Sequence, residues 1–196
     1  MRRTLRLFKN WKGVITKIES SPGVLSDKVT VLTLEIKIKL GDYKDIVFES
    51  KKFIENTSLD SNLVYGQLKN LRVGSTVFFD GLIAKNKENQ IDYSSYHLHD
   101  EDNVCDPQIN FYTLSISPTK TAFANSTNIS KVTDIQFKTF KTMEESVKGK
   151  MTSKELKNKL SDYKSEVEPL MKSLTTDEKK YVFSFTECLG SQFNKN

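Results

Sequence analysis

The hydrophobic pattern is most regular between residues 29 and 40, where apolar and polar side chains alternate one by one. Such alternation places successive side chains on opposite faces of a β-strand. The apolar positions predict the buried inner wall of a rolled-up sheet: Leu32, Leu34, Ile36, Ile38 and Leu40. The intervening positions predict its solvated outer face: Val31, Thr33, Glu35, Lys37 and Lys39.

Further stretches of strand-like composition lie on either side of this one. They predict strands at residues 11–19, 44–50, 71–83 and 90–98, with a turn at residues 20–23 after the first. Gly81 inside the fourth strand predicts a bulge or a close approach of two backbones. Residues 109–116 predict one additional strand that covers an edge or leads out of the sheet.

Between the third and fourth strands the period changes from two to that of a helix. Val64, Leu68 and Leu71 recur at helical spacing, and Asp60 or Ser61 would cap the helix start. Five strands with one helix between the third and the fourth resemble the OB-fold over residues 11–100. The resemblance implies a small closed barrel that holds single-stranded nucleic acid on the outer face of its second and third strands.

The C-terminal part of the chain has a different character. Residues 117–140 are rich in Ser, Thr and Asn and predict a polar connector, and residues 141–196 predict a helical hairpin. Thr152…Glu155 and Thr175…Glu178 fit the capping-box pattern at two helix starts. Gly190 would end the second helix, and Pro169 would break or kink the first. The first helix carries a narrow apolar seam, defined as Leu156, Leu160, Tyr163, Val167, Leu170 and Leu174.

The predicted fold class is therefore mainly β with appended α: a barrel at residues 11–116 and a helical hairpin after the connector. Residues 1–10 form a basic N-terminal arm, because residues 1–17 carry six bases and no acid within a chain of net charge +5. Such a segment attracts phosphate, although a solubilising start or an organelle transit peptide would also have this composition.

Basic residues interleaved with aromatic ones predict a surface for single strands, since bases stack on aromatic faces while cations follow the phosphates. The alternatives are core packing for the aromatic residues and protection of a sheet edge for the lysines. The candidate nucleic-acid-binding residues are Arg2, Arg3, Arg6, Lys9, Trp11, Lys12, Lys37, Lys39, Tyr43, Lys44 and Phe78.

One cluster invites a metal-dependent interpretation. His97 and His99 would share a face of a strand, followed by acidic residues, but the chain has no other histidine to complete such a site. Phosphate-binding glycine loops, nucleophile elbows and paired Cys-x-x-Cys motifs are absent from the sequence. The sequence therefore predicts no enzyme and no cofactor.

Two cysteines far apart, Cys105 and Cys188, favour a reducing compartment, and no apolar run reaches the ~20 residues of a membrane span, so we expect a cytoplasmic protein. The favoured function is non-catalytic single-stranded DNA binding, as an accessory factor of a phage, plasmid or other mobile element. The alternative is an assembly module that meets a protein partner, or a second copy, through the helices at residues 152–190.

Overall fold

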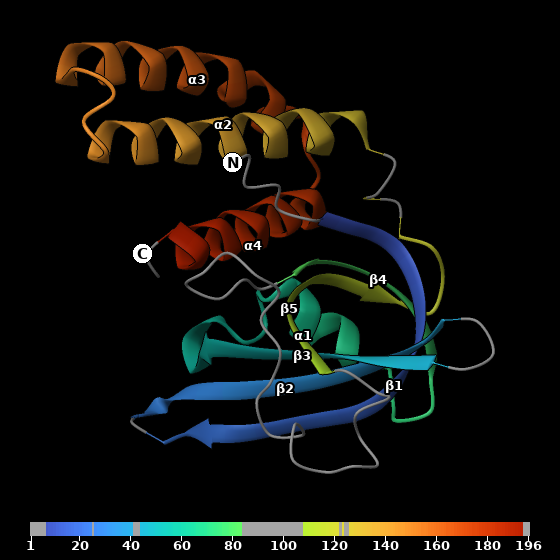
Figure 1. The fold of residues 1–196 in the computed structure, drawn as a ribbon. Helices are drawn as coiled ribbons and strands as arrows, with labels where there is room; N and C mark the ends of the chain where they lie inside the picture. Colours follow the sequence, from blue (N-terminus) through green and yellow to red (C-terminus); the bar gives the residue numbers. More distant parts are fainter. Residues whose placement is uncertain are drawn as a thin grey trace. The chain divides into compact units, whose positions relative to one another are not determined.

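The structure is a computed structural model that describes residues 7–24, 26–40, 44–83, 108–121, 123 and 126–193. Internal contacts divide the chain into two compact units, Met1–Thr121 and Ala122–Asn196. The first contains the strands and the second contains three helices (Figure 1). We describe each by itself, as the barrel unit and the helical unit.

The barrel unit is a closed sheet of five strands in the order β1-β2-β3-β5-β4. Strands β3 and β5 pair in parallel, and every other neighbouring pair is antiparallel. This confirms the predicted five-stranded, OB-like barrel with a helix between the third and fourth strands. The strands are β1 (Leu7–Gly23), β2 (Ser26–Leu40), β3 (Lys44–Glu55), β4 (Thr76–Ile83) and β5 (Gln108–Ser117); a short 3₁₀ turn, η1 (Asn56–Ser58), and helix α1 (Leu63–Leu68) follow β3.

The alternation on β2 determines which side of the sheet is buried. Its apolar positions from Leu32 to Ile38 are buried, whereas Lys39 is exposed. At the centre Phe48 meets the rings of Phe79 and Phe111 at centroid distances of 6.1 and 5.4 Å. Helix α1 adds Val64 and Leu68 to the same core. Its cap is Asn62, which accepts a hydrogen bond from the Tyr65 amide, rather than the predicted Asp60 or Ser61.

Two strand predictions need correction. Strand β1 begins at Leu7 and ends at Gly23, so residues 7–10 of the predicted arm and the predicted turn at residues 20–23 belong to it. The ladder with β2 continues to Gly23, and the extra hydrogen bonds outweigh the turn composition of this stretch. The barrel closes with β5, the stretch predicted only as an additional strand; residues 90–98 lie outside the described residues.

A buried carboxylate fixes the irregular part of β1. Asn10 adopts a left-handed conformation (φ 53°) at a break in the β1–β4 register, a backbone state that asparagine tolerates better than most residues. Its amide donates to Asp80 Oδ1 at 2.6 Å, and the hydroxyls of Ser115 and Thr121 each donate to Asp80 Oδ2 at 2.9 Å. Asp80 is fully buried, so these donors replace the water it would otherwise bind.

The prediction for Gly81 is confirmed. The β4–β5 register shifts between Asp80 and Gly81, and a Cβ at Gly81 would stand 2.7 Å from the Tyr112 carbonyl oxygen and 2.8 Å from Phe111 Cδ2. Neither a backbone carbonyl nor a packed core ring can move away cheaply. Two backbones therefore approach here more closely than any side chain would permit.

We accordingly expect Gly81→Ala to lower the free energy of unfolding of the barrel by about 1–3 kcal/mol, because the methyl group overpacks a closed site. The measurement is urea unfolding followed by the fluorescence of Trp11, the single tryptophan, which lies in β1. Gly66→Ala is the matched control, because Gly66 lies in α1 with nothing within 4 Å of an added Cβ. It should instead stabilise by up to about 1 kcal/mol; equal destabilisation by both variants would contradict the prediction.

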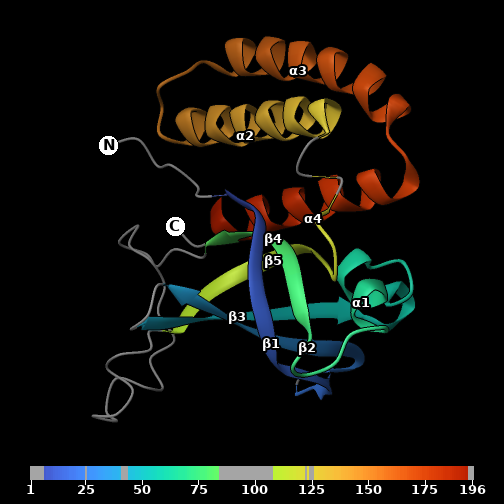
Figure 2. The same ribbon diagram turned by 90° about the vertical axis from the view of Figure 1, so that its right-hand side faces the viewer.

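The helical unit consists of α2 (Thr127–Val147), α3 (Ser153–Ser173) and α4 (Thr176–Phe193). Helix α2 packs against both α3 and α4, which is visible in both views (Figures 1 and 2). The predicted two-helix hairpin is thus a three-helix arrangement, and residues 127–140, predicted as connector, form most of α2. Buried Ile129 and Val132 anchor α2 by tertiary packing, which outweighs the low helix propensity of its Thr and Asn residues.

The predicted helix starts are confirmed, α3 is not broken at Pro169, and the predicted stop at Gly190 is wrong. Thr152 and Glu155 form a reciprocal capping box, and the Thr175 and Glu178 pair makes the same two contacts, at 2.9 and 3.3 Å. These backbone hydrogen bonds hold the pKa values of both glutamates below their ordinary range. Helix α3 continues through Pro169 to Ser173, and α4 continues through Gly190 to Phe193.

Candidate functional site

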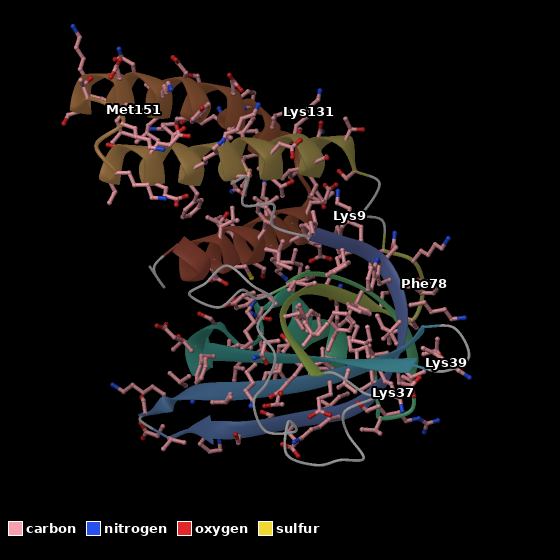
Figure 3. The ribbon with its side chains drawn as sticks, viewed as in Figure 1. Lys9, Lys37, Lys39, Phe78, Lys131 and Met151 are labelled. Atoms are coloured by element: carbon pink, nitrogen blue, oxygen red, sulfur yellow. The ribbon has the colours of Figure 1, made fainter. Side chains whose placement is uncertain are left out.

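The outer sheet face is the solvent side of β1, β2 and β3, formed by the residues that alternate with the core positions. On β2, Lys37 lies between Val14 of β1 and Val47 of β3, and Lys39 lies opposite Asp45 of β3. This confirms that both predicted lysines point away from the barrel interior. Figure 3 shows Lys37, Lys39 and Phe78 on one side of the barrel.

Charges on the outer sheet face balance one another. Lys37 pairs with Asp45 at 2.5 Å, Lys51 with Glu49 at 2.5 Å, and Lys17 with Glu19 at 3.2 Å. The hydrogen bond that the Lys17 ammonium donates to Glu19 holds the pKa of Lys17 above its ordinary value. The paired acids offset the attraction of this face for phosphate. Among the described residues, five bases and six acids alternate with the core positions here: Lys12, Lys17, Lys37, Lys39, Lys51, Glu19, Asp27, Glu35, Asp45, Glu49 and Glu55.

Among the described residues, Phe53 is the most exposed aromatic side chain of the outer sheet face. Its side chain is 72% exposed, on β3 opposite Val31 of β2. The ring lies next to the exposed Lys51, two positions earlier on the same face. An exposed ring with a neighbouring cation is the combination on which an unpaired base stacks. Phe53 lies eight residues along β3 from Asp45, about 26 Å from the predicted lysine cluster.

Phe53 is not among the predicted site residues, because the predicted third strand ended at Ser50. The strand continues to Glu55, paired with β2 along its whole length. The alternation of side chains along the strand could have identified Phe53. Ile46 and Phe48 point inward, so in an unbroken strand every odd-numbered residue, including Phe53, points outward.

The other predicted aromatic residues are less accessible. Trp11 is partly buried against the core, with ring centroids 3.9 Å from Phe8 and 5.9 Å from Phe48. Phe78 on β4 is also partly buried, opposite Lys12 of β1 and Ser117 of β5. Trp11 thus contributes to the core, whereas Phe78 and the exposed Lys12 lie side by side at the β1–β4 pairing.

The remaining predicted site residues are only partly described. Lys9 lies in β1 and is partly buried. Lys44 begins β3, although its side chain is not described. The predicted residues that lie outside the described part of the chain are Arg2, Arg3, Arg6, Tyr43, His97 and His99. The described residues therefore bring Lys37, Lys39, Lys12 and Phe78 to neighbouring positions at one end of the face.

The described residues contain no cluster of three or more His, Cys, Asp or Glu side chains that would hold a metal ion. Cys188 is buried within α4, where a thiol behaves as a small apolar group. The buried Asp80 has all its contacts inside the barrel. The accessible features of the described part of the outer sheet face are its balanced charges and the exposed ring of Phe53.

No helix in the described part of the chain is long and apolar enough to cross a membrane. Comparison with known proteins finds no matching protein-family model, no matching curated protein and no matching solved structure.

Proposed function

We propose that the protein is a non-catalytic single-stranded nucleic-acid-binding protein that receives the strand, preferentially DNA, on its outer sheet face. The observation that carries the proposal is the exposed ring of Phe53 on the β2–β3 surface of an OB-like barrel. The other phenylalanines of β3, β4 and β5 are buried, except Phe78, which is half-buried. The exposed ring of Phe53 therefore lacks the free energy of burial that its neighbours gain, and a ligand stacked on it would supply that free energy. We further propose a cytoplasmic location and a role as an accessory factor of a mobile element.

In this proposal stacking supplies most of the affinity and charge supplies less. Lys51 and Lys17 lie on the same face as Phe53, but both already pair with carboxylates. A phosphate that displaces these carboxylates gains little net attraction. We therefore expect a shallow salt dependence for binding by this face, with a slope of log K against log salt of about −1 to −2, corresponding to two or three phosphates.

Replacement of Phe53 by alanine should weaken binding of a fluorescein-labelled oligo-dT roughly 5- to 100-fold in fluorescence anisotropy, the loss of one stacked base. Phe183→Ala is the matched control, because Phe183 is a similarly exposed phenylalanine (61%) on α4. It should leave the affinity unchanged. Absence of binding by the wild-type chain at low salt, or an equal loss in both variants, would remove the proposal.

A second function is favoured by a separate observation in the helical unit. The apolar seam of α3 is only half-buried from Leu156 to Leu170, although it packs against α2. An apolar stripe in that state is typical of a helix surface that meets another protein. We propose this assembly role as the alternative to nucleic-acid binding.

A further inference from the structure

An open groove of about 280 Å³ runs between α2 and α3. Its apolar walls are Met143 of α2 with Leu160 and Val167 of α3, and its polar walls include Gln136, Tyr163 and Lys164. Met143 is 41% exposed, and α3 has no fully buried residue between Ser153 and Ser173. Two packed helices cannot bury all of the apolar side chains between them, so the groove leaves apolar surface of α2 and α3 in contact with water.

The charges of α3 are unevenly distributed along its length. Its N-terminal half carries Lys154, Lys157 and Lys159 against Glu155, and its C-terminal half carries Asp162, Glu166 and Glu168 against Lys164 and Lys172. All nine side chains are exposed, and Lys164 pairs with Glu168 at 3.8 Å on the same helix. A helix with this distribution is complementary to a copy of itself that runs in the opposite direction.

We propose that a second copy of this chain docks on the α2–α3 groove, so that the two α2–α3 hairpins form an antiparallel four-helix bundle. A two-fold axis between Asp162 and Tyr163 places Lys157 opposite Glu168 of the second copy and Lys159 opposite Glu166 of the second copy. The same axis brings the two apolar seams together at Leu160 and Tyr163. The 4-3-4-3-4 spacing of the seam is the spacing that such packing requires.

Gln136 of α2 is one of the polar residues of the groove wall, and its buried Oε1 has no hydrogen-bond partner within the described part of the chain. The inference makes the assembly role specific by naming the partner, and it is independent of nucleic-acid binding.

The test is the solution mass of the full chain, measured by light scattering after size exclusion without any oligonucleotide. The wild-type chain should elute as a dimer of 45 kDa, twice the chain mass of 22.5 kDa, at about 100 µM. Met143→Glu should weaken the dimer by at least about 100-fold, because it introduces an unpaired charge into the bundle core. Lys131→Glu, an exposed change on the same helix, is the control and should leave the dimer intact.

A charge exchange tests the antiparallel direction. Lys159→Glu alone should weaken the dimer roughly 3- to 10-fold, since it faces Glu166 of the second copy, and adding Glu166→Lys should restore it. A monomeric wild-type chain, a dimer unaffected by Met143→Glu, or no rescue in the double variant would each overturn the inference. Circular dichroism of every variant confirms that the helices are retained. Because no oligonucleotide is present, failure here leaves the nucleic-acid proposal standing.

Discussion

Replacing Asp80 by alanine is expected to lower the free energy of unfolding of the barrel by about 3–5 kcal/mol. The carboxylate accepts hydrogen bonds from the Asn10 amide and from the hydroxyls of Ser115 and Thr121, all within the barrel unit. Alanine would leave the Asn10 amide and the Ser115 hydroxyl without this acceptor, while the Thr121 hydroxyl keeps Asn10 Oδ1 at 3.1 Å. The loss should also release the left-handed turn at Asn10, because the contact that holds its amide is gone.

Urea unfolding followed by Trp11 fluorescence measures this effect in the barrel. Asp80→Asn should lower the free energy of unfolding less than Asp80→Ala. The carbonyl oxygen of the asparagine still accepts a hydrogen bond, and its amide group can donate to a hydroxyl oxygen in place of the second carboxylate oxygen. Asp60→Ala is the control, since Asp60 is exposed and only pairs with Lys69 at the surface; its unfolding midpoint should match that of the wild type. If Asp80→Ala unfolds at the wild-type midpoint, the network does not stabilise the barrel.

The second large effect is expected at Phe48, where alanine should cost about 3–5 kcal/mol. Phe48 is buried and meets four aromatic rings at centroid distances of 5.4 to 6.1 Å, those of Phe8, Trp11, Phe79 and Phe111. Truncation would open a cavity that these rings cannot collapse to fill, because each is held by its own strand. Trp11 emission should also shift to the red in the folded state, since the indole loses an edge-on neighbour.

Phe53→Ala provides the comparison on the same strand. Phe53 faces solvent, so its removal should change the free energy of unfolding by no more than about 0.5 kcal/mol. The two variants remove the same atoms from β3 at opposite faces. Similar losses for both would show that the inner and outer faces of β3 have been assigned wrongly.

The barrel was predictable because the strict alternation from Leu32 to Leu40 leaves one arrangement that turns this apolar row inward and the polar row outward. The strand ends were not predictable, because pairing with a neighbour extends a strand beyond its favourable composition. Residues 20–23 of β1 and 51–55 of β3 became strand through the ladder with β2. The same extension hid Phe53, the exposed aromatic ring among the described residues of the candidate surface.

Helix α2 escaped prediction for a different physical reason. Its sequence begins Thr-Asn-Ile-Ser-Lys-Val-Thr, in which every residue except the lysine has weak intrinsic helix propensity, and two of its buried positions are threonines. The Thr133 hydroxyl donates a hydrogen bond to the Ile129 carbonyl, which allows this threonine to be buried. A hydropathy pattern treats threonine as polar and therefore predicts an exposed position. Packing against α3 and α4 determines this helix, and packing partners are not visible in a local window. The capping boxes were predictable because both partners lie within four residues.

The parallel pairing of β3 with β5 has a consequence for how the barrel is built. It joins Val47 to Gln108, so the last strand to be synthesised closes the sheet between two strands that precede it. Until then β3 and β4 each present an unpaired row of amides and carbonyls that another chain could extend. Contacts so distant in sequence form slowly, in about milliseconds to seconds, and the interval before β5 arrives is when aggregation competes with folding.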